Sequence, residues 1–194
     1  MMRRIATAIA VFVVATVLAL LAAWGTLLHN PWQQGIANGP WRTSLVTGST
    51  GADMYTRAYV AITGLFALNP SEAVYFSASI DDAGRPLLAR CSYRVEGRPV
   101  PARWWSITAY SDDHFLIPNA INRFSYNMGN LDVSDGKRFS ITAAPIEQPG
   151  NWLPTGTNGN GFTLLFRLYN ATPETIASLS TLSLPSISRV GECP

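Results

Sequence analysis

The amino-acid sequence predicts a mainly β protein: a β-sandwich or jelly-roll-like domain with one packed helix, preceded by a single N-terminal transmembrane helix. Three observations predict this fold class. The chain begins with a long apolar run, continues with one stretch of helical periodicity, and then holds many short β-rich runs between turn residues. Short strands separated by turn signals at intervals of about ten to twenty residues are typical of sandwiches and jelly rolls.

The N-terminal apolar segment runs from Ile5 to Leu28 without a charged side chain, and Arg3 and Arg4 stand directly before it. A helix of this length, rising about 1.5 Å per residue, spans the roughly 30 Å hydrocarbon core of a bilayer. The two arginines favour a cytoplasmic N-terminus by the positive-inside rule. We therefore expect residues 1–29 to be a single-pass anchor in the inner (cytoplasmic) membrane, with the globular domain in the periplasm.

A cleaved signal peptide is the competing interpretation, because such peptides also pair a basic start with an apolar core. That core has about 7–15 residues, and the run here is longer. Trp24 also interrupts the small residues that a cleavage site would need. We favour the uncleaved anchor, and both interpretations place the rest of the chain outside the cytoplasm.

The segment after the anchor, residues 30–50, is expected to be a linker and lead-in because proline and glycine recur in it. A helix is expected from about Ala52 to Leu68, with Asp53 as its N-cap and Asn69-Pro70 as its end. Its apolar residues recur at steps of three and four and are expected to face the core. They are Met54, Ala58, Ala61, Ile62, Leu65 and Phe66.

The remaining sequence changes to a period of two and is rich in β-forming residues, so residues 51–194 are expected to be one β-sandwich domain. A short helix is expected from about Pro173 to Leu179, with Thr172 as its cap. Strands are expected at residues 73–80, 87–95, 104–110, 123–126, 139–143 and 162–168.

The two cysteines, Cys91 and Cys193, are expected to form a disulfide, because an oxidising compartment favours pairing. The bond would close a loop of about 100 residues, for which the chain-entropy model gives roughly 4–5 kcal/mol. It would fasten the carboxyl tail to the body of the domain. Two unpaired thiols, one of them buried in the core, are the alternative.

The charge pattern argues against a nucleic-acid partner. The net charge is only +2, and the basic residues are scattered rather than gathered into a stripe. In a strand, Arg90, Arg94 and Arg98 would share one face and would suit an acidic polysaccharide or phosphate. The solvated face of a half-buried sheet accounts for the same arginines.

The sequence contains no recognisable motif for metal binding or nucleophilic catalysis. No two histidines or cysteines fall at the spacing of metal ligands, and no Gly-x-Ser-x-Gly elbow occurs. The aspartates, Asp112 and Asp113 among them, stand in or beside predicted turns, where a solvated carboxylate is the default. We therefore expect no metal and no cofactor, and we favour a non-catalytic role while leaving catalysis open.

Aromatic residues accompanied by amide and guanidinium groups form the candidate ligand site. Such groups suit sugar-like or amphipathic ligands. The same aromatics are also the usual material of a sandwich core, which is the competing interpretation. The candidate ligand-binding residues are Trp105, Tyr110, Asn122, Arg123, Trp152 and Arg167.

Several of these segments carry a resemblance to a known family. The segments that carry it are residues 103–110, 119–124, 151–154 and 167–169, together with the helix-to-strand stretch from Arg57 to Tyr75. It resembles the bacterial domain of unknown function 1214 over roughly residues 40–190, with Leu184-Pro185 fitting near the end. The resemblance implies a β-sandwich module of the cell envelope, often preceded in larger exported proteins by a second domain, numbered 1254. It implies no reaction and no catalytic residues.

Two functional hypotheses follow from the sequence. The first is a membrane-anchored cell-envelope protein that serves as a non-catalytic binding or assembly module for an envelope glycan, lipid or protein partner. The alternative is a hydrolase or lyase acting on an envelope polymer. That alternative requires two carboxylates, or His114 and a carboxylate, to converge in one cleft.

Overall fold

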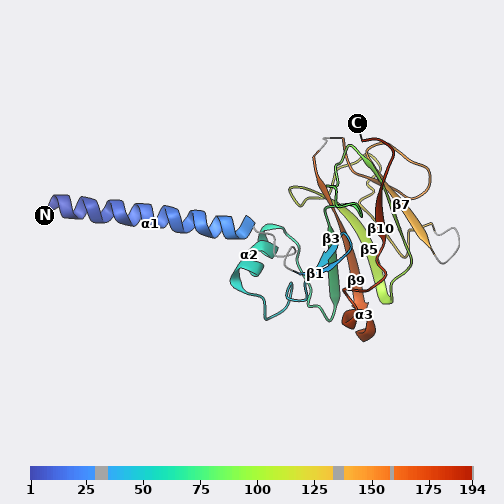
Figure 1. Ribbon diagram of the computed structural model, residues 1–194, viewed down its shortest axis with the longest axis horizontal. Coiled ribbons are helices and arrows are strands. Elements are labelled where there is room, and N and C mark those ends of the chain that lie inside the picture. Colours follow the sequence, from blue (N-terminus) through green and yellow to red (C-terminus); the bar gives the residue numbers. More distant parts are fainter. Residues whose placement is uncertain (29–34, 133–137, 158–159, 194) are drawn as a thin grey trace.

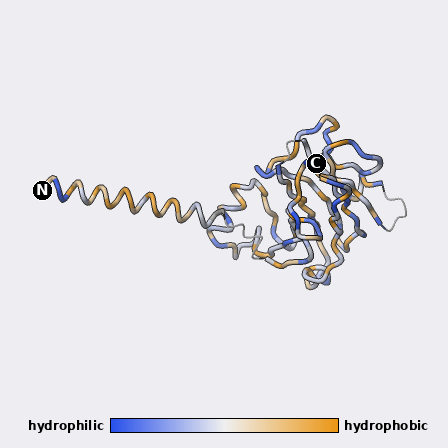
Figure 2. Tube along the Cα trace, turned by 45° about the horizontal axis from the view of Figure 1, so that its top comes forward, coloured by the Kyte–Doolittle hydropathy of each residue, from blue (hydrophilic) through white to orange (hydrophobic). Residues whose placement is uncertain are grey.

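The computed structural model describes residues 1–28, 35–132, 138–157 and 160–193, and shows a long helix followed by a β-sandwich (Figure 1). Helix α1 (Met2–Leu28) extends away from the sandwich and is hydrophobic along most of its length (Figure 2). Met2–Thr26 is long and apolar enough to cross a bilayer, a test that a signal sequence would also pass. Residues 29–34, at the expected junction of anchor and lead-in, lie outside the described residues.

The larger sheet has six strands in the order β1-β2-β3-β9-β5-β6, and every neighbouring pair is antiparallel. Its long central strand pairs with residues far away in the sequence, for example Phe166 with both Phe76 and Ile107. The six strands are β1 (Ile36–Asn38), β2 (Trp41–Thr43), β3 (Ala73–Ala78), β9 (Phe162–Ala171), β5 (Ala102–Ser111) and β6 (Ser125–Asn127).

The smaller sheet has four strands in the order β10-β4-β7-β8. Its pairs are antiparallel except for β7 and β8, which run parallel. The two sheets together confirm the predicted mainly β fold class. The four strands are β10 (Ser186–Val190), β4 (Ser92–Gly97), β7 (Phe139–Ala144) and β8 (Trp152–Pro154).

The core lies between the two sheets because alternate residues of each strand point inward. In β9 the side chains of Leu164, Phe166 and Leu168 are completely buried in this core. The residues that alternate with them, including Thr163 and Arg167, therefore face the outer side of the larger sheet. This alternation decides which side chains are available for a site on that side.

Strand prediction failed in part around Leu87–Val95, since β4 begins only at Ser92. Cys91 and Leu87 are buried, yet the segment from Leu87 to Cys91 is irregular and contributes an isolated bridge at Leu88 rather than a strand. Arg90 and Arg98 thus fall outside β4, and the expected row of three arginines on one strand does not form. Arg94, on β4, is exposed and lies 3.9 Å from Glu96.

The lead-in segment differs from the expected linker, because β1 and β2 belong to the larger sheet. Trp41 of β2 is fully buried, and its Nε1 donates a hydrogen bond to the carbonyl of Pro185 at 2.7 Å. Gly39, at φ +59°, makes the tight turn between the two strands. Strands of three residues are too short for a periodicity signal, so the glycines and prolines dominated the prediction.

Helix α2 (Met54–Ile62) is shorter than expected, although its predicted cap is confirmed. The Asp53 carboxylate accepts hydrogen bonds from the backbone N–H groups of Tyr55 at 2.8 Å and Thr56 at 3.0 Å. The helix ends well before Leu68 because Gly64 follows its last turn in the left-handed region, at φ +62°.

The expectation that the apolar stripe of α2 faces the core is wrong for most of its residues, whereas Leu65 packs against a buried cluster. Met54, Ile62 and Phe66 are 75%, 59% and 92% exposed, and Thr56 is the buried residue of the helix. The sandwich core is already closed by its two sheets, so α2 covers the outer face of the larger sheet. There only a small cluster of Ala73, Tyr75 and Leu165 is buried beneath the α2 segment.

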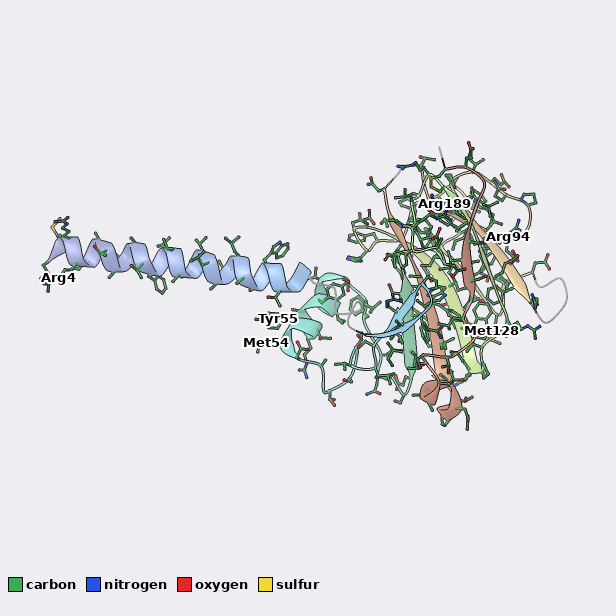
Figure 3. The ribbon with its side chains drawn as sticks, viewed as in Figure 1. Arg4, Met54, Tyr55, Arg94, Met128 and Arg189 are labelled. Atoms are coloured by element: carbon green, nitrogen blue, oxygen red, sulfur yellow. A yellow bond between two sulfur atoms is a disulfide. The ribbon has the colours of Figure 1, made fainter. Side chains whose placement is uncertain are left out.

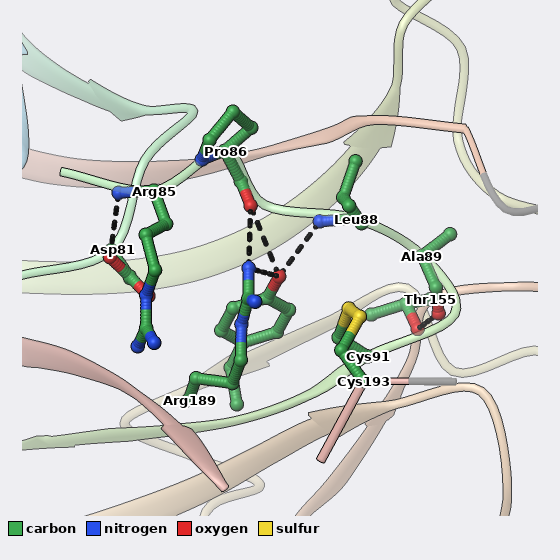
Figure 4. The surroundings of a disulfide bond; sticks show 10 residues. Asp81, Arg85, Pro86, Leu88, Ala89, Cys91, Thr155, Arg189 and Cys193 are labelled. Atoms are coloured by element: carbon green, nitrogen blue, oxygen red, sulfur yellow. Dashed lines mark hydrogen bonds and ion pairs between the residues drawn. A yellow bond between two sulfur atoms is a disulfide. The ribbon is translucent and has the colours of Figure 1, made fainter. Parts of the chain in front are cut away.

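Helix α3 and the disulfide follow the prediction, whereas the C-terminal strand β10 was not predicted. Helix α3 (Pro173–Ala177) begins at the predicted cap, where the Thr172 hydroxyl accepts a hydrogen bond from the N–H of Thr175 at 3.3 Å. The predicted disulfide between Cys91 and Cys193 is present, with Cα atoms 4.7 Å apart (Figure 4). It ties the tail after β10 to the irregular segment before β4.

Candidate functional site

A cavity of about 290 Å³ lies on the outer face of the larger sheet, beneath the segment that joins α2 to β3. The sheet supplies its floor, with Ser77 from β3, Tyr110 from β5, and Thr163, Leu165 and Arg167 from β9. The end of α2 and the residues after it supply a wall, namely Tyr59, Thr63, Gly64, Leu65 and Phe66. His114, from the turn after β5, completes the lining.

Strand register brings the floor residues together. Tyr110 pairs with Thr163 across β5 and β9, and Ser77 pairs with Leu165 across β3 and β9. Paired residues of neighbouring strands point to the same face, so these side chains are adjacent. Arg167 lies two residues farther along β9 on that same face.

The segment after the wall is held by two close contacts, one to strand β3 and one to the segment between β2 and α2. The Tyr75 hydroxyl accepts a hydrogen bond from the backbone N–H of Leu68 at 2.8 Å. Gly48 packs so tightly against the backbone of Leu68 that a Cβ atom there would lie 2.1 Å from the Leu68 oxygen. The segment after α2 is therefore held above the sheet, and the space under it stays open.

Arg167 is the only lining residue with a permanent charge. Its guanidinium donates hydrogen bonds to the Thr108 hydroxyl at 3.0 Å and the Tyr110 hydroxyl at 2.7 Å. Its Cζ atom lies 5.5 Å from the centre of the Tyr110 ring. Within the described part of the chain Arg167 forms no ion pair. A half-buried guanidinium whose partners are all neutral retains donors and charge for an anion.

His114 contributes to the lining from the turn after β5 and lies near Tyr59 of the wall. Its backbone is in the left-handed region, at φ +66°, and its ring centre lies 6.4 Å from that of Tyr59, edge to face. Burial raises the pKa of the Tyr59 hydroxyl, so this group stays neutral and can only share hydrogen bonds. The polar part of the cavity therefore combines Arg167 with the hydroxyl groups of Tyr59 and Tyr110.

The neighbouring Asp113 is occupied by its own turn. Its carboxylate accepts hydrogen bonds from the Ser111 hydroxyl and, at 3.2 Å, from the N–H of Phe115. The Ser111 hydrogen bond, followed by the Phe115 one, lowers the pKa of this exposed carboxyl group. This turn matches the sequence prediction for Ser111-Asp112-Asp113.

Apolar side chains line part of the cavity. Leu65 belongs to the wall and the buried Leu165 to the floor, and Phe66, which is 92% exposed, stands at the mouth. Phe66 also holds a backbone φ of +45°, which a bulky residue rarely adopts. Strain of this kind is concentrated at functional sites.

The lining of the cavity combines a cation with apolar side chains. No aspartate or glutamate is among the residues that line the cavity. Within the described ranges, no group of three or more His, Cys, Asp or Glu residues is placed to hold a metal ion. A cationic floor with an apolar mouth matches a molecule that has an anionic group and an apolar part.

Of the six residues predicted from the sequence, Tyr110 and Arg167 meet in this cavity. Trp105 is 1% exposed and packs against Phe139 and Phe166 in the core, so neither face of its ring is open to a ligand. Its placement follows from the inward alternation of β5.

The other three predicted residues lie outside the cavity lining. Arg123 stacks over the Tyr126 ring at 5.0 Å, and the Tyr126 hydroxyl donates to the Trp152 carbonyl at 3.2 Å. The indole N–H of Trp152 donates to the Ala144 carbonyl at 2.9 Å. Asn122 is exposed in a turn at φ +51°.

Sequence reasoning missed the remaining lining residues. Thr163 had a usable signal, because it alternates with the buried residues of β9 on the same face as Arg167. Tyr59 and Phe66 had none, since no local pattern shows that the α2 segment folds back over a sheet whose strands come later in the chain.

The comparisons with known proteins concern fold and family. The model of the family described as "Protein of unknown function (DUF1214)" matches residues 72–173, which include the cavity floor and His114 but not the wall. No curated protein matches the chain.

Two solved structures are similar to this chain. The VPA0106 protein of Vibrio parahaemolyticus is 24% identical over 72% of this chain and 36% of that one, with a TM-score of 0.57. A putative uncharacterized protein from Burkholderia cenocepacia is 20% identical over 88% of this chain and 40% of that one, with a TM-score of 0.48. The chain thus spans little more than a third of the length of the first, and the likeness concerns the fold.

Proposed function

The chain belongs to the DUF1214 family of unknown function, and from that premise we propose that it is a membrane-anchored cell-envelope protein that binds an amphipathic anion without catalysis. The anion is a phosphate or carboxylate joined to an acyl or similar apolar chain. Its charged group lies at Arg167, and its apolar part lies against Leu65, Leu165 and Phe66.

The observation that carries this proposal is the pairing state of Arg167. A partly buried guanidinium loses hydration, and its neutral partners Thr108 and Tyr110 do not offset its charge. A phosphate or carboxylate would accept charge-assisted hydrogen bonds from the N–H groups of Arg167. An envelope glycan, which the sequence also allowed, would leave the apolar mouth of the cavity unmatched, and a lipid would fill it.

The proposed location is the inner membrane, with the N-terminus in the cytoplasm and the sandwich in the periplasm. Arg3 and Arg4 at the start of an apolar helix support this orientation. The Cys91–Cys193 disulfide supports an oxidising compartment.

The alternative, a hydrolase or lyase on an envelope polymer, needs a carboxylate beside His114 in the cleft. Asp113 is the nearest in sequence, and its carboxylate bonds to Ser111 and Phe115 in the turn. No specific observation favours this second function.

Ligand titration of the full chain in phosphate-free maltoside micelles tests the binding proposal. The probe is dihexanoyl phosphatidic acid, followed by calorimetry, with dihexanoyl phosphatidylcholine and inorganic phosphate as separate arms. We expect the phosphatidic acid to bind more tightly than either. Arg167→Gln should weaken it about tenfold to a hundredfold, because a hydrogen bond to a charged group contributes roughly 1.5–3 kcal/mol.

Arg94→Gln is the matched control, since Arg94 is an exposed arginine on the other sheet. It should leave the affinity unchanged. Equal affinity of the wild type and Arg167→Gln, or no saturable binding of phosphatidic acid, would refute the proposal. Binding of inorganic phosphate as tight as that of the lipid analogue would refute its amphipathic part.

A further inference from the structure

Helix α2 carries an apolar stripe that has no partner in the sandwich. At 3.6 residues per turn, Met54, Ala58 and Ile62 fall on one side of the helix and Thr56 falls roughly opposite. Thr56 is buried against the domain, whereas Met54 and Ile62 are 75% and 59% exposed. The stripe therefore faces away from the sandwich, and Phe66, after the helix end, is a further exposed apolar residue at 92%.

The position of α2 relative to α1 indicates what covers this stripe. The two helices are in contact, and α2 lies beside the carboxyl end of α1 (Figure 1). Figure 3 shows Met54 and Tyr55 on the side of the domain nearest α1, with Arg4 at the far end of that helix. If α1 crosses the bilayer, the stripe is at the level where α1 leaves it.

Chain length independently limits how far the domain can move away. Strand β1 starts at Ile36, and α1 ends at Leu28. A connection of this length reaches at most about 25–30 Å even when fully extended, because each residue adds about 3.6 Å. A separate protein would have to fit between the bilayer and the domain within that distance, whereas the lipid surface is already there.

We propose that the apolar stripe of α2, with Tyr55 and Phe66, docks into the outer-leaflet surface of the membrane that holds α1. Methionine, isoleucine and phenylalanine side chains suit the boundary between head groups and acyl chains, and a tyrosine ring suits the head-group zone. The sandwich is thereby held in one orientation on the bilayer instead of swinging on its tether.

The consequence for the cavity is direct, because Phe66 belongs to both surfaces. It lies in the docked stripe and also lines the mouth of the cavity that leads to Arg167. A lipid of the outer leaflet can then reach Arg167 with its head group while its chain stays in apolar surroundings. This inference rests on the membrane anchorage of α1 in the proposed function, and it adds the docked surface.

Labelling of the full chain in vesicles tests the docking. The chain has no free cysteine among its described residues, so Met54→Cys can be labelled selectively with an environment-sensitive fluorophore. Met128→Cys is the matched control, because Met128 is 50% exposed and lies across the sandwich from α1 (Figure 3). The vesicles contain phosphatidylcholine and phosphatidylglycerol, with and without lipid spin-labelled at the head group.

We expect the label at position 54 to be quenched at least about twofold by the spin-labelled lipid, as for a helix in the interface. The label at position 128 should be unaffected. The double variant Met54→Glu with Ile62→Glu, carrying the label at Phe66→Cys, should lose the quenching seen with Phe66→Cys alone. Its thermal unfolding should not change, because both replaced side chains are exposed.

The proposal is overturned if the label at position 54 is no better quenched than the label at 128 while the chain floats with the vesicles. The label at position 54 could instead become shielded from water as the protein concentration rises, without quenching by the spin-labelled lipid. That result would place a second copy of the chain on the stripe, and it would also overturn the proposal. Flotation of the vesicles is measured separately. A chain that fails to float with them would refute the membrane anchor, and with it the proposed function.

Discussion

Removal of the disulfide by Cys193→Ser should destabilise the domain by about 3–5 kcal/mol without changing its fold. Cys193 is the better position for this test because Cys91 is completely buried in the core. A serine at position 91 would add the cost of a buried hydroxyl, about 1–3 kcal/mol, to the effect of the lost bond.

The magnitude follows from the length of chain that the bond closes. Cys91 and Cys193 are separated by 102 positions. For a loop of about 100 residues the chain-entropy model gives about 4.7 kcal/mol at 25 °C, nearly all of it from the unfolded state. The native tail is held independently, since β10 pairs along β4 from Ser186↔Glu96 to Val190↔Ser92.

Urea unfolding of the full chain in maltoside micelles, followed by tryptophan fluorescence, measures the effect. The samples are oxidised wild type, wild type with dithiothreitol, and Cys193→Ser with and without dithiothreitol. With a denaturant slope of about 2 kcal/mol per molar urea, the midpoint should fall by about 1.5–2.5 M. Reduced wild type should match Cys193→Ser, and dithiothreitol should not affect the variant further.

A loss of less than about 1 kcal/mol would refute the reasoning, because the unfolded state would then already be constrained by other contacts. A change in the circular dichroism of folded Cys193→Ser would refute the second half of the argument. It would mean that the bond, and not the β10–β4 pairing, keeps the tail in place.

Two further predictions concern single residues of the sandwich. Gly48→Ala should cost more than about 3 kcal/mol in the free energy of unfolding, because it adds a clash with the Leu68 backbone to a left-handed φ of +79°. Gly84→Ala, at φ +76° with open space around it, should cost only about 1–2 kcal/mol in the same urea measurement. Asp81→Asn should destabilise the domain by about 1.5–3 kcal/mol at neutral pH, since Arg85 donates to this buried carboxylate at 2.9 Å and pairs with it.

The pH dependence of the Asp81→Asn effect has a definite sign. Burial acts to raise the pKa of Asp81, but the backbone and side-chain hydrogen bonds of Arg85 outweigh it, so the pKa is lowered. The contribution is therefore fully present above the unfolded pKa of about 3.9 and is lost as the pH falls through the folded pKa. The difference between wild type and variant should be constant from about pH 5 to 7 and shrink below about pH 4.

One outcome would contradict the glycine prediction, and another would contradict the Asp81 prediction. Equal losses for Gly48→Ala and Gly84→Ala would show that the chain near Leu68 can move aside. A wild-type advantage over Asp81→Asn that persists unchanged to about pH 2 would show that ionisation of Asp81 contributes nothing.

The fold was predictable where a local pattern matched a local cause. The charge-free run of α1 and the caps Asp53 and Thr172 depend on neighbouring residues and were predicted from them. The disulfide was predictable for a different reason, because two cysteines have only one way to pair. The strands β1, β2, β8 and β10 were missed. For β2 the reason is that its stability comes from pairing with β3 and from the burial of Trp41 against Pro185.

The candidate site was predictable only in part. Tyr110 and Arg167 were chosen as an aromatic and a guanidinium of the kind that ligands use, and they meet in the cavity. Trp105 was chosen by the same rule, but the parity of its position on β5 turns it inward. Residue type alone does not show whether a strand residue points inward or outward, because that depends on its position within the strand.

By itself, the sequence determined a helix apolar and long enough to cross a membrane and the alternation of β9 that puts Thr163 and Arg167 on one face, and it favoured the pairing of the two cysteines. Only the tertiary structure decided that this face would be covered by α2 and that the helix would turn its apolar stripe away from the sandwich. The physical reason is that burial depends on which surfaces the other elements have already filled. Once two sheets close the core, the next apolar stripe must find its partner outside it.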